Sequence, residues 1–76
     1  MEMIPVRARG GKWTVAGYNE HQHRWAVNRE HGVAFGRTPS DAVDWAYADG
    51  SRPSDLFATK RGAMAYIEEE MIYAQS

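Results

Sequence analysis

The sequence KWTVAGYNEHQHRWAVNREHGVAFG, residues 12–36, decides the fold of this chain. Large apolar residues occupy every second position in three short runs: Trp13 and Val15, Trp25 and Val27, Val33 and Phe35. This period of two predicts β-strands that bury one face. The segments between the runs, residues 19–22 and 30–32, are short and rich in turn-forming residues. They therefore favour antiparallel hairpins over long crossover connections.

A fourth strand is expected before this stretch, over residues 3–7. Pro5 confines that strand to an edge of the sheet. Proline has no backbone N–H, so it cannot complete the hydrogen bonds of a strand that has neighbours on both sides. The first half of the chain thus predicts three or four antiparallel strands.

The second half of the chain predicts two helices. The first helix is expected to begin at Thr38, whose hydroxyl can cap the helix, with Pro39 at the first helical position. Its apolar stripe consists of Ala42, Val43 and Ala46, with Trp45 on its flank and Gly50 as terminator. The second helix is expected to begin at Thr59, with Tyr66 on the flank of an apolar stripe made of Ala63, Met64, Ile67, Met71 and Ala74. Residues 49–55, DGSRPSD, form a turn-rich linker between the two helices.

These elements predict an α+β fold: a three- or four-stranded antiparallel sheet with two helices packed on one face. A single domain over residues 1–76 is expected, because a chain of this length holds one modest hydrophobic core. The expected core consists of Trp13, Val15, Trp25, Val27, Phe35, Val43, Ala46, Met64 and Ile67.

The composition excludes several classes of protein. The chain has no cysteine, which excludes disulfides, thiolate zinc sites and a thiol nucleophile. It has no apolar segment typical of a signal peptide or a membrane-spanning helix, so we expect a cytoplasmic protein with no membrane partner. Motifs for nucleotide binding, serine hydrolases and zinc proteases are missing from the sequence. We therefore expect a protein that is not an enzyme and has no catalytic residues and no cofactor.

All three histidines lie within residues 17–32, GYNEHQHRWAVNREHG. His21 and His23 have the spacing of two metal ligands on one strand face, and His31 could approach from the next turn. The histidines fall at predicted turns, however, and only Glu20 and Glu30 could complete a ligand set. We therefore interpret them as solvated turn residues and expect no metal site.

Charge is distributed unevenly along the chain, although the formal net charge is only −1. Residues 1–38 hold six basic against three acidic side chains, and residues 39–76 hold three basic against seven acidic ones. On the sheet face opposite the tryptophans, small residues such as Thr14, Ala16 and Ala26 would lie among basic and polar ones. That basic face, which predicts nucleic-acid binding as an alternative function, would contain Arg7, Arg9, Lys12, Tyr18, Arg24, Asn28 and Arg29.

The last helix offers a second surface, which favours binding to another protein. Tyr66 and Tyr73 lie two helical turns apart beside Glu69 and Glu70, and Ile72 lies nearly opposite the expected core stripe. Tyrosines among charged residues are typical of protein contacts, because the ring buries area at low entropic cost. We therefore expect a small non-enzymatic binding protein whose partner is another protein, with a homodimer as an open alternative. This build is typical of accessory or inhibitor proteins of bacteria and their phages.

Overall fold

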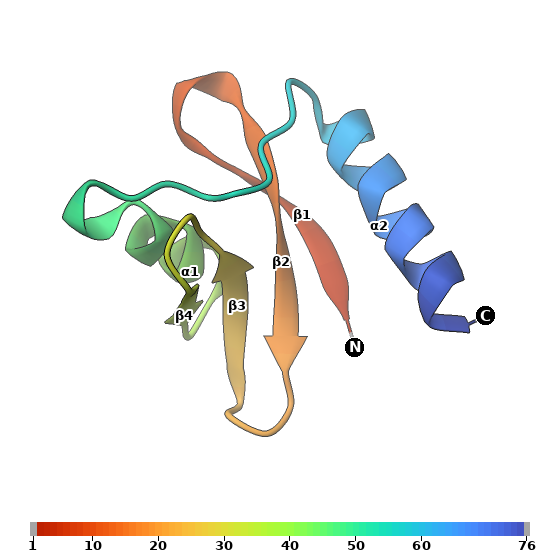
Figure 1. Cartoon of the computed structure of the whole chain (residues 1–76), viewed down its shortest axis with the longest axis horizontal. Helices are drawn as coiled ribbons and strands as arrows, with labels where there is room; N and C mark the ends of the chain where they lie inside the picture. Colours follow the sequence, from red (N-terminus) through yellow and green to blue (C-terminus); the bar gives the residue numbers. More distant parts are fainter. Residues whose placement is uncertain (1, 76) are drawn as a thin grey trace.

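A computed structural model describes the backbone of residues 2–75 and the side chains of residues 2–70. It contains a four-stranded antiparallel sheet in the order β1-β2-β3-β4, two α-helices and two short 3-10 turns (Figure 1). The elements are β1 (Met3–Arg7), η1 (Arg9–Gly11), β2 (Trp13–Asn19), β3 (Arg24–Asn28), β4 (Val33–Gly36), α1 (Pro39–Ala46), η2 (Ala48–Gly50) and α2 (Lys60–Gln75). The predicted α+β class, the antiparallel sheet and both helices are confirmed.

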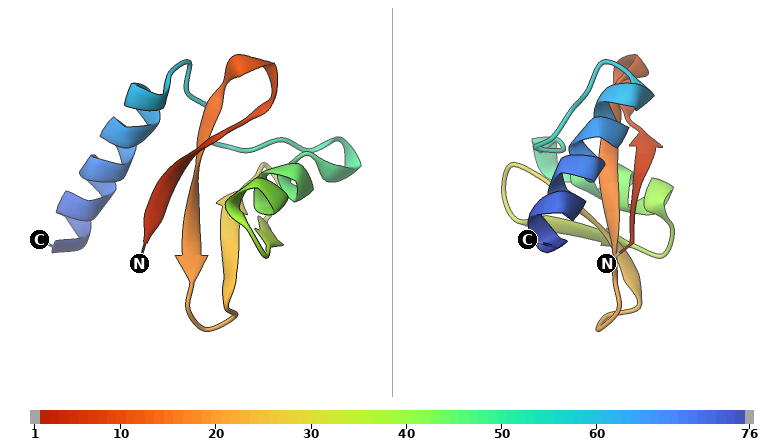
Figure 2. Two further views of the ribbon diagram at one scale, coloured as in Figure 1. Left: turned by 180° about the vertical axis from the view of Figure 1, so that it is seen from behind. Right: turned by 90° about the vertical axis from the view of Figure 1, so that its right-hand side faces the viewer.

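The two helices pack on opposite faces of the sheet, which corrects the prediction that they share one face. Ala16 lies in the cluster under α1, whereas its neighbour Val15 lies in the cluster under α2. Adjacent residues of a strand point to opposite faces, so both faces of β2 are covered. The edge-on view of Figure 2 shows α1 and α2 on either side of the sheet.

The register between β2 and β3 explains this arrangement. Tyr18 pairs with Trp25, and Gly17 pairs with Ala26, so even-numbered residues of β2 share a face with odd-numbered residues of β3. Trp13 and Trp25 consequently lie on opposite faces: Trp25 packs toward α1 and Trp13 toward α2.

The cluster under α1 is built from small side chains. Ala42, Val43 and Ala46 are buried as the stripe predicts, and they pack on residues from all four strands, among them Val6, Ala16, Val27 and Ala34. The helix begins where the sequence indicates, since the Thr38 hydroxyl accepts a hydrogen bond from the Asp41 amide at 3.1 Å. Trp45 is on the outer side of α1 and is 62% exposed.

The cluster under α2 contains Val15, Ala63 and Ile67, with Met3, Trp13, Phe57 and Tyr66 packed around it. Met64 was expected in the core, but it is 47% exposed. The helix turns Ala63 and Ile67 toward the sheet, which places Tyr66 at the boundary of the buried stripe and Met64 on the solvent side. The predicted positions Met71 and Ala74 lie outside the described side chains.

The linker, residues 51–58, completes the sheet between β2 and β3. These strands pair only over the end of β2, from Gly17 to Asn19. Alongside the other end of β2, Trp13 and Phe57 exchange two backbone hydrogen bonds of 2.8 Å, and alongside β3 the Ser54 amide donates to the Asn28 carbonyl at 3.0 Å. Pro53 is among the most deeply buried side chains of the described residues. The linker therefore holds the two diverging strands together.

Candidate binding groove

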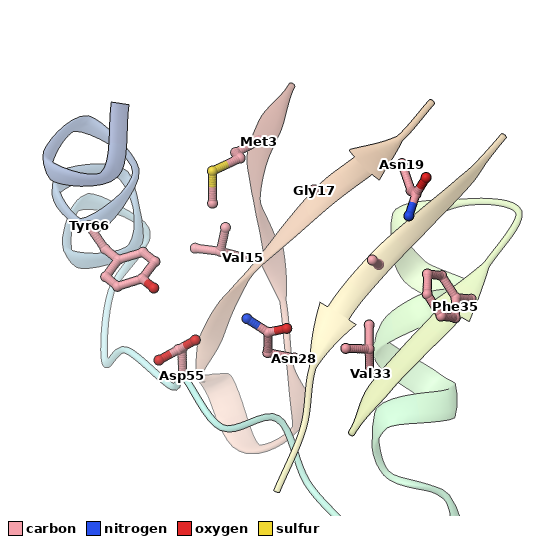
Figure 3. Close-up of a pocket in the computed structure, with 10 residues that line it drawn as sticks. Met3, Val15, Gly17, Asn19, Asn28, Val33, Phe35, Asp55 and Tyr66 are labelled. Atoms are coloured by element: carbon pink, nitrogen blue, oxygen red, sulfur yellow. The ribbon is translucent and has the colours of Figure 1, made fainter. Parts of the chain in front are cut away.

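An open groove lies on the sheet face that α2 only partly covers. Helix α2 packs on β1 and β2, and the same face of β3 and β4 has no helix over it among the described residues. The groove has a volume of about 320 Å³, and Figure 3 shows its lining side chains contributed by the strands, the linker and α2. It is lined by Met3, Val15, Gly17, Asn19, Ala26, Asn28, Val33, Phe35, Asp55 and Tyr66.

The floor and walls of this groove are mostly apolar. Gly17 and Ala26 are paired across β2 and β3, and their small size keeps the floor low. On the α2 side, the wall is the ring of Tyr66, which packs against Phe57 with ring centroids 5.5 Å apart. On the far side, Phe35 and Val33 of β4 form the other wall (Figure 3).

Polar groups are placed at the margins of the groove. The Oδ1 atom of Asn19 accepts hydrogen bonds from the amides of His21 and Gln22, which orients its side chain and fixes the turn. The Asp55 carboxylate and the Asn28 amide lie on the side of the linker. Burial raises the pKa of the Tyr66 hydroxyl, and the nearby carboxylates of Asp55 and Glu70 raise it further. Tyr66 is therefore a neutral hydrogen-bonding group at physiological pH.

A second, shallower groove follows the outer edge of β4. Its volume is about 330 Å³, and it is lined by three consecutive strand residues, Val33 to Phe35, together with Arg29, Trp45, Ala48 and Asp49. Successive strand residues point to opposite faces, so a groove that all three of them line runs along the strand edge itself. Trp45 forms the wall on the α1 side.

The predicted basic face is divided between the two sides of the sheet. Tyr18 lies on the α1 side, where its ring meets Trp25 edge-on with centroids 5.3 Å apart. Thr14 and Ala16 are buried on that side as well. Arg24, Ala26 and Asn28 point to the groove side, because their neighbours Trp25 and Val27 pack under α1. No single face therefore combines Tyr18 with Arg24 and Asn28.

The remaining basic residues of that prediction lie at the periphery. The Arg9 guanidinium is 4.4 Å from the ring centroid of Tyr47, and the Arg7 guanidinium is 5.6 Å from that of Trp13. Lys12 is exposed in the turn before β2, and Arg29 is half-buried at the end of β3. Arg7, Arg9 and Lys12 therefore belong to the β1–β2 connection, whereas Arg29 lies at the end of β3.

Of the predicted protein-binding residues on the last helix, only one lines the groove among the described side chains. Tyr66 lines the groove, and Glu69 and Glu70 are exposed on the helix. Ile72 and Tyr73 lie outside the described side chains. The sequence pointed to Tyr66 but missed Phe35, Val33 and Asp55, which reach the same groove from β4 and the linker. Their alternation marked Val33 and Phe35 as strand residues, and only the register shows which face they occupy.

The histidines lie where the sequence places them, in turns. His21 and His23 are exposed in the β2–β3 turn, where His23 adopts a left-handed φ of 55°, and His31 is exposed in the β3–β4 turn. Among the described residues, no three histidine, aspartate or glutamate side chains are grouped closely enough to hold a metal ion.

The chain matches no protein-family model, no curated protein and no solved structure. Within the described part of the chain, neither helix combines the length and the apolar character needed to cross a bilayer.

Proposed function

We propose that this chain is a non-enzymatic binding protein that engages a segment of another protein in the groove between α2 and β4. The observation that carries this proposal is the open apolar groove of about 320 Å³, with Tyr66 on one wall and Phe35 on the other. Occupying a partner's surface in this way is how an accessory or inhibitor protein acts. The proposal assigns the chain no catalytic step.

The chemistry of the groove suits an apolar side chain presented by a protein surface. Its volume is near the lower end for ligand pockets, and a small floor between aromatic walls fits one or two large side chains. Asn28, Asp55 and the Tyr66 hydroxyl lie at the margin, where they can bond the backbone of the bound segment. Aromatic residues beside polar groups are typical of residues that dominate binding energy.

Nucleic-acid binding is the weaker proposal. The basic residues on which it rests are divided between two sheet faces. The acidic side chains of Asp55 and Glu70 lie beside Tyr66, one of the two aromatic rings in the groove that could stack on a base. A polyanion in this groove would approach both carboxylates, which opposes binding.

The test compares two tyrosine substitutions. Ala26→Tyr fills the floor of the groove, whereas Ala65→Tyr makes the same change on the exposed outer side of α2. Tagged wild-type protein and both variants are used to capture partners from cells of the source organism, and affinities for the captured protein are then measured. We expect Ala65→Tyr to bind like the wild type and Ala26→Tyr to bind at least about tenfold more weakly.

Two results would contradict the proposal. One is a specific partner that Ala26→Tyr binds as tightly as the wild type does, since the groove would then not be the contact surface. The other is tight binding of DNA or RNA at physiological salt that Ala26→Tyr leaves unchanged, because this result would support the alternative function.

A further inference from the structure

We propose that two copies of this chain associate through the outer edge of β4, so that Val33 of each copy pairs with Phe35 of the other in antiparallel orientation. The partner is a second copy of the chain itself, and the contact extends the four-stranded sheet across both molecules. The contact uses the backbone edge of β4, although the side chains of Val33 and Phe35 also line the groove.

The backbone of β4 presents its hydrogen-bonding groups at this edge. The Arg29 amide donates to the Gly32 carbonyl at 3.1 Å, which makes residues 29 and 32 a hydrogen-bonded pair. Hydrogen-bonded and non-hydrogen-bonded pairs alternate along an antiparallel ladder. The pairs Asn28–Val33 and Ala26–Phe35 are therefore non-hydrogen-bonded pairs. Val33 and Phe35 consequently direct their N–H and C=O groups away from β3.

The edge is self-complementary in register. When a two-fold axis perpendicular to the sheet passes between the Ala34 residues of the two copies, Val33 lies opposite Phe35 of the second copy, and both pairs can exchange N–H···O=C bonds. Side chains stay on matching faces, because the paired positions differ by two residues. This single register thus pairs the outward backbone groups of both copies and also keeps their side chains on matching faces of the sheet.

The two edges of the sheet differ in how they are protected. At the β1 edge, Pro5 removes a backbone donor, and α2 packs against the strand. The residues of β4, Val33–Gly36, include no proline and no charged side chain. Helix α1 packs on one face of this strand, and within the described part of the chain no further strand pairs with its outer edge. Proteins normally protect a free edge with one of these devices. The unprotected edge is therefore consistent with an edge that pairs.

The side chains around the edge have the composition of a contact. Val33 is 43% exposed and Trp45 is 62% exposed, and both line the groove of about 330 Å³ along β4. Filling this groove with the β4 strand of a second copy buries both side chains. The two Trp45 rings then approach each other near the two-fold axis.

The charges are also complementary. Arg37 follows β4 at one end of the edge, whereas Asp49 lines the edge groove together with Val33 and Arg29. Glu30, which lies near Val33 in the sequence, is already paired with Arg52 within the same chain. Antiparallel association brings Arg37 of each copy toward Asp49 of the other. Because the two-fold axis is perpendicular to the sheet, the open faces of both copies point to the same side.

Sedimentation velocity over a range of concentrations tests the association. Val33→Pro removes an outward N–H without breaking a bond to β3, and Val33→Lys places a charge on the edge. Met64→Lys is the matched control, since Met64 is comparably exposed on the far side of α2. We expect the wild type and Met64→Lys to form a dimer with a dissociation constant on the order of micromolar, and both Val33 variants to associate at least about tenfold more weakly.

Amide hydrogen exchange tests the register. In the dimer, the amides of Val33 and Phe35 should exchange more slowly as concentration rises, whereas amides in the exposed β2–β3 turn should not change. A wild type that stays monomeric throughout the concentration range would overturn the proposal. A dimer that the Val33 variants form equally well, or one in which Val33 and Phe35 remain unprotected, would also overturn it.

Discussion

Thr14 shows how one polar residue ties the linker to the sheet. It is only 1% exposed, and its hydroxyl donates to the Asp55 carbonyl at 2.6 Å. The alternation in the sequence marked Thr14 as solvent-facing, because it lies between Trp13 and Val15. It is buried instead because α1 covers the face of β2 opposite to α2. A hydroxyl in that position is tolerated because the linker carbonyl accepts its hydrogen bond.

Replacing Thr14 with valine should destabilise the fold. The valine side chain keeps the shape but leaves the Asp55 carbonyl without its buried donor, which costs roughly 1–3 kcal/mol. Urea denaturation of Thr14→Val measures this loss, and Ser54→Ala is the control, because it removes an exposed hydroxyl from the same linker. Equal stability of the two variants would show that the Thr14 hydrogen bond contributes nothing.

Tyr66 predicts a dependence of stability on alkaline pH. Its pKa is raised in the folded protein by burial and by Asp55 and Glu70, so the folded state holds this proton more tightly than the unfolded state does. The resulting stabilisation is present below the unfolded pKa and is lost as pH rises through the folded pKa. Tyr66→Phe should therefore lose less stability than the wild type between neutral and strongly alkaline pH, as measured by thermal unfolding. Parallel pH profiles for the two proteins would contradict this expectation.

Among the elements, the helix boundaries could be predicted most securely from sequence. Thr38 caps α1, and the Thr59 hydroxyl accepts from the Gly62 amide at 3.1 Å at the start of α2. These signals are local, so a single sequence contains them. The face of the sheet on which each strand buries its apolar residues is not local. It depends on the β2–β3 turn, whose length pairs Tyr18 with Trp25, and one residue more or less in that turn would reverse the faces.

Gly36 controls the contact between β4 and α1. A Cβ atom at this position would lie 2.4 Å from the Ala42 backbone nitrogen and 2.7 Å from the Asp41 carbonyl carbon, and neither backbone atom can move without shifting the helix. Gly36→Ala should therefore cost on the order of 3 kcal/mol, because it forces the strand and the helix apart.

Gly62 provides the control for this substitution. A Cβ atom there would meet only ordinary contacts of 3.5 Å, and the residue lies in the first turns of α2. Gly62→Ala should be neutral or should stabilise the protein by up to about 1 kcal/mol, since alanine favours helix over the unfolded chain. Chemical denaturation of both variants measures the difference. A Gly36→Ala variant as stable as Gly62→Ala would refute the close approach of β4 and α1.

For the whole molecule, the division of the core between two faces has a measurable consequence. Removing residues 59–76 uncovers Val15 and the aromatic residues around it, although the cluster under α1 remains intact. We expect the shortened chain to lose the cooperative thermal transition that near-ultraviolet circular dichroism records, because one face of β1 and β2 becomes exposed. Removing only residues 71–76 leaves Ala63, Tyr66 and Ile67 in place and should change the transition little. Equal melting of the full chain and the chain without residues 59–76 would contradict this view.

The candidate site could be predicted only in part, because it is a property of the whole molecule. Tyr66 was visible in the sequence as an aromatic residue beside carboxylates. The groove itself exists because α2 covers β1 and β2 and stops there, which places Tyr66 opposite Phe35. No local pattern encodes how far across a sheet a helix lies. The sequence likewise does not show that the exposed Trp45 lies beside the β4 edge.

The linker, residues 51–58, lies beside β2 and β3 in the sheet, and this position also affects how the chain folds during synthesis. The ribosome releases all four strands before residues 53–57 emerge, yet those residues fill the space beside Trp13 and Asn28. A nascent chain that ends before them can form hairpins but cannot close the sheet, and it exposes the apolar side of β2 until α2 has also been made. Productive folding is thus delayed until Ala63 and Ile67 of α2 have left the ribosome.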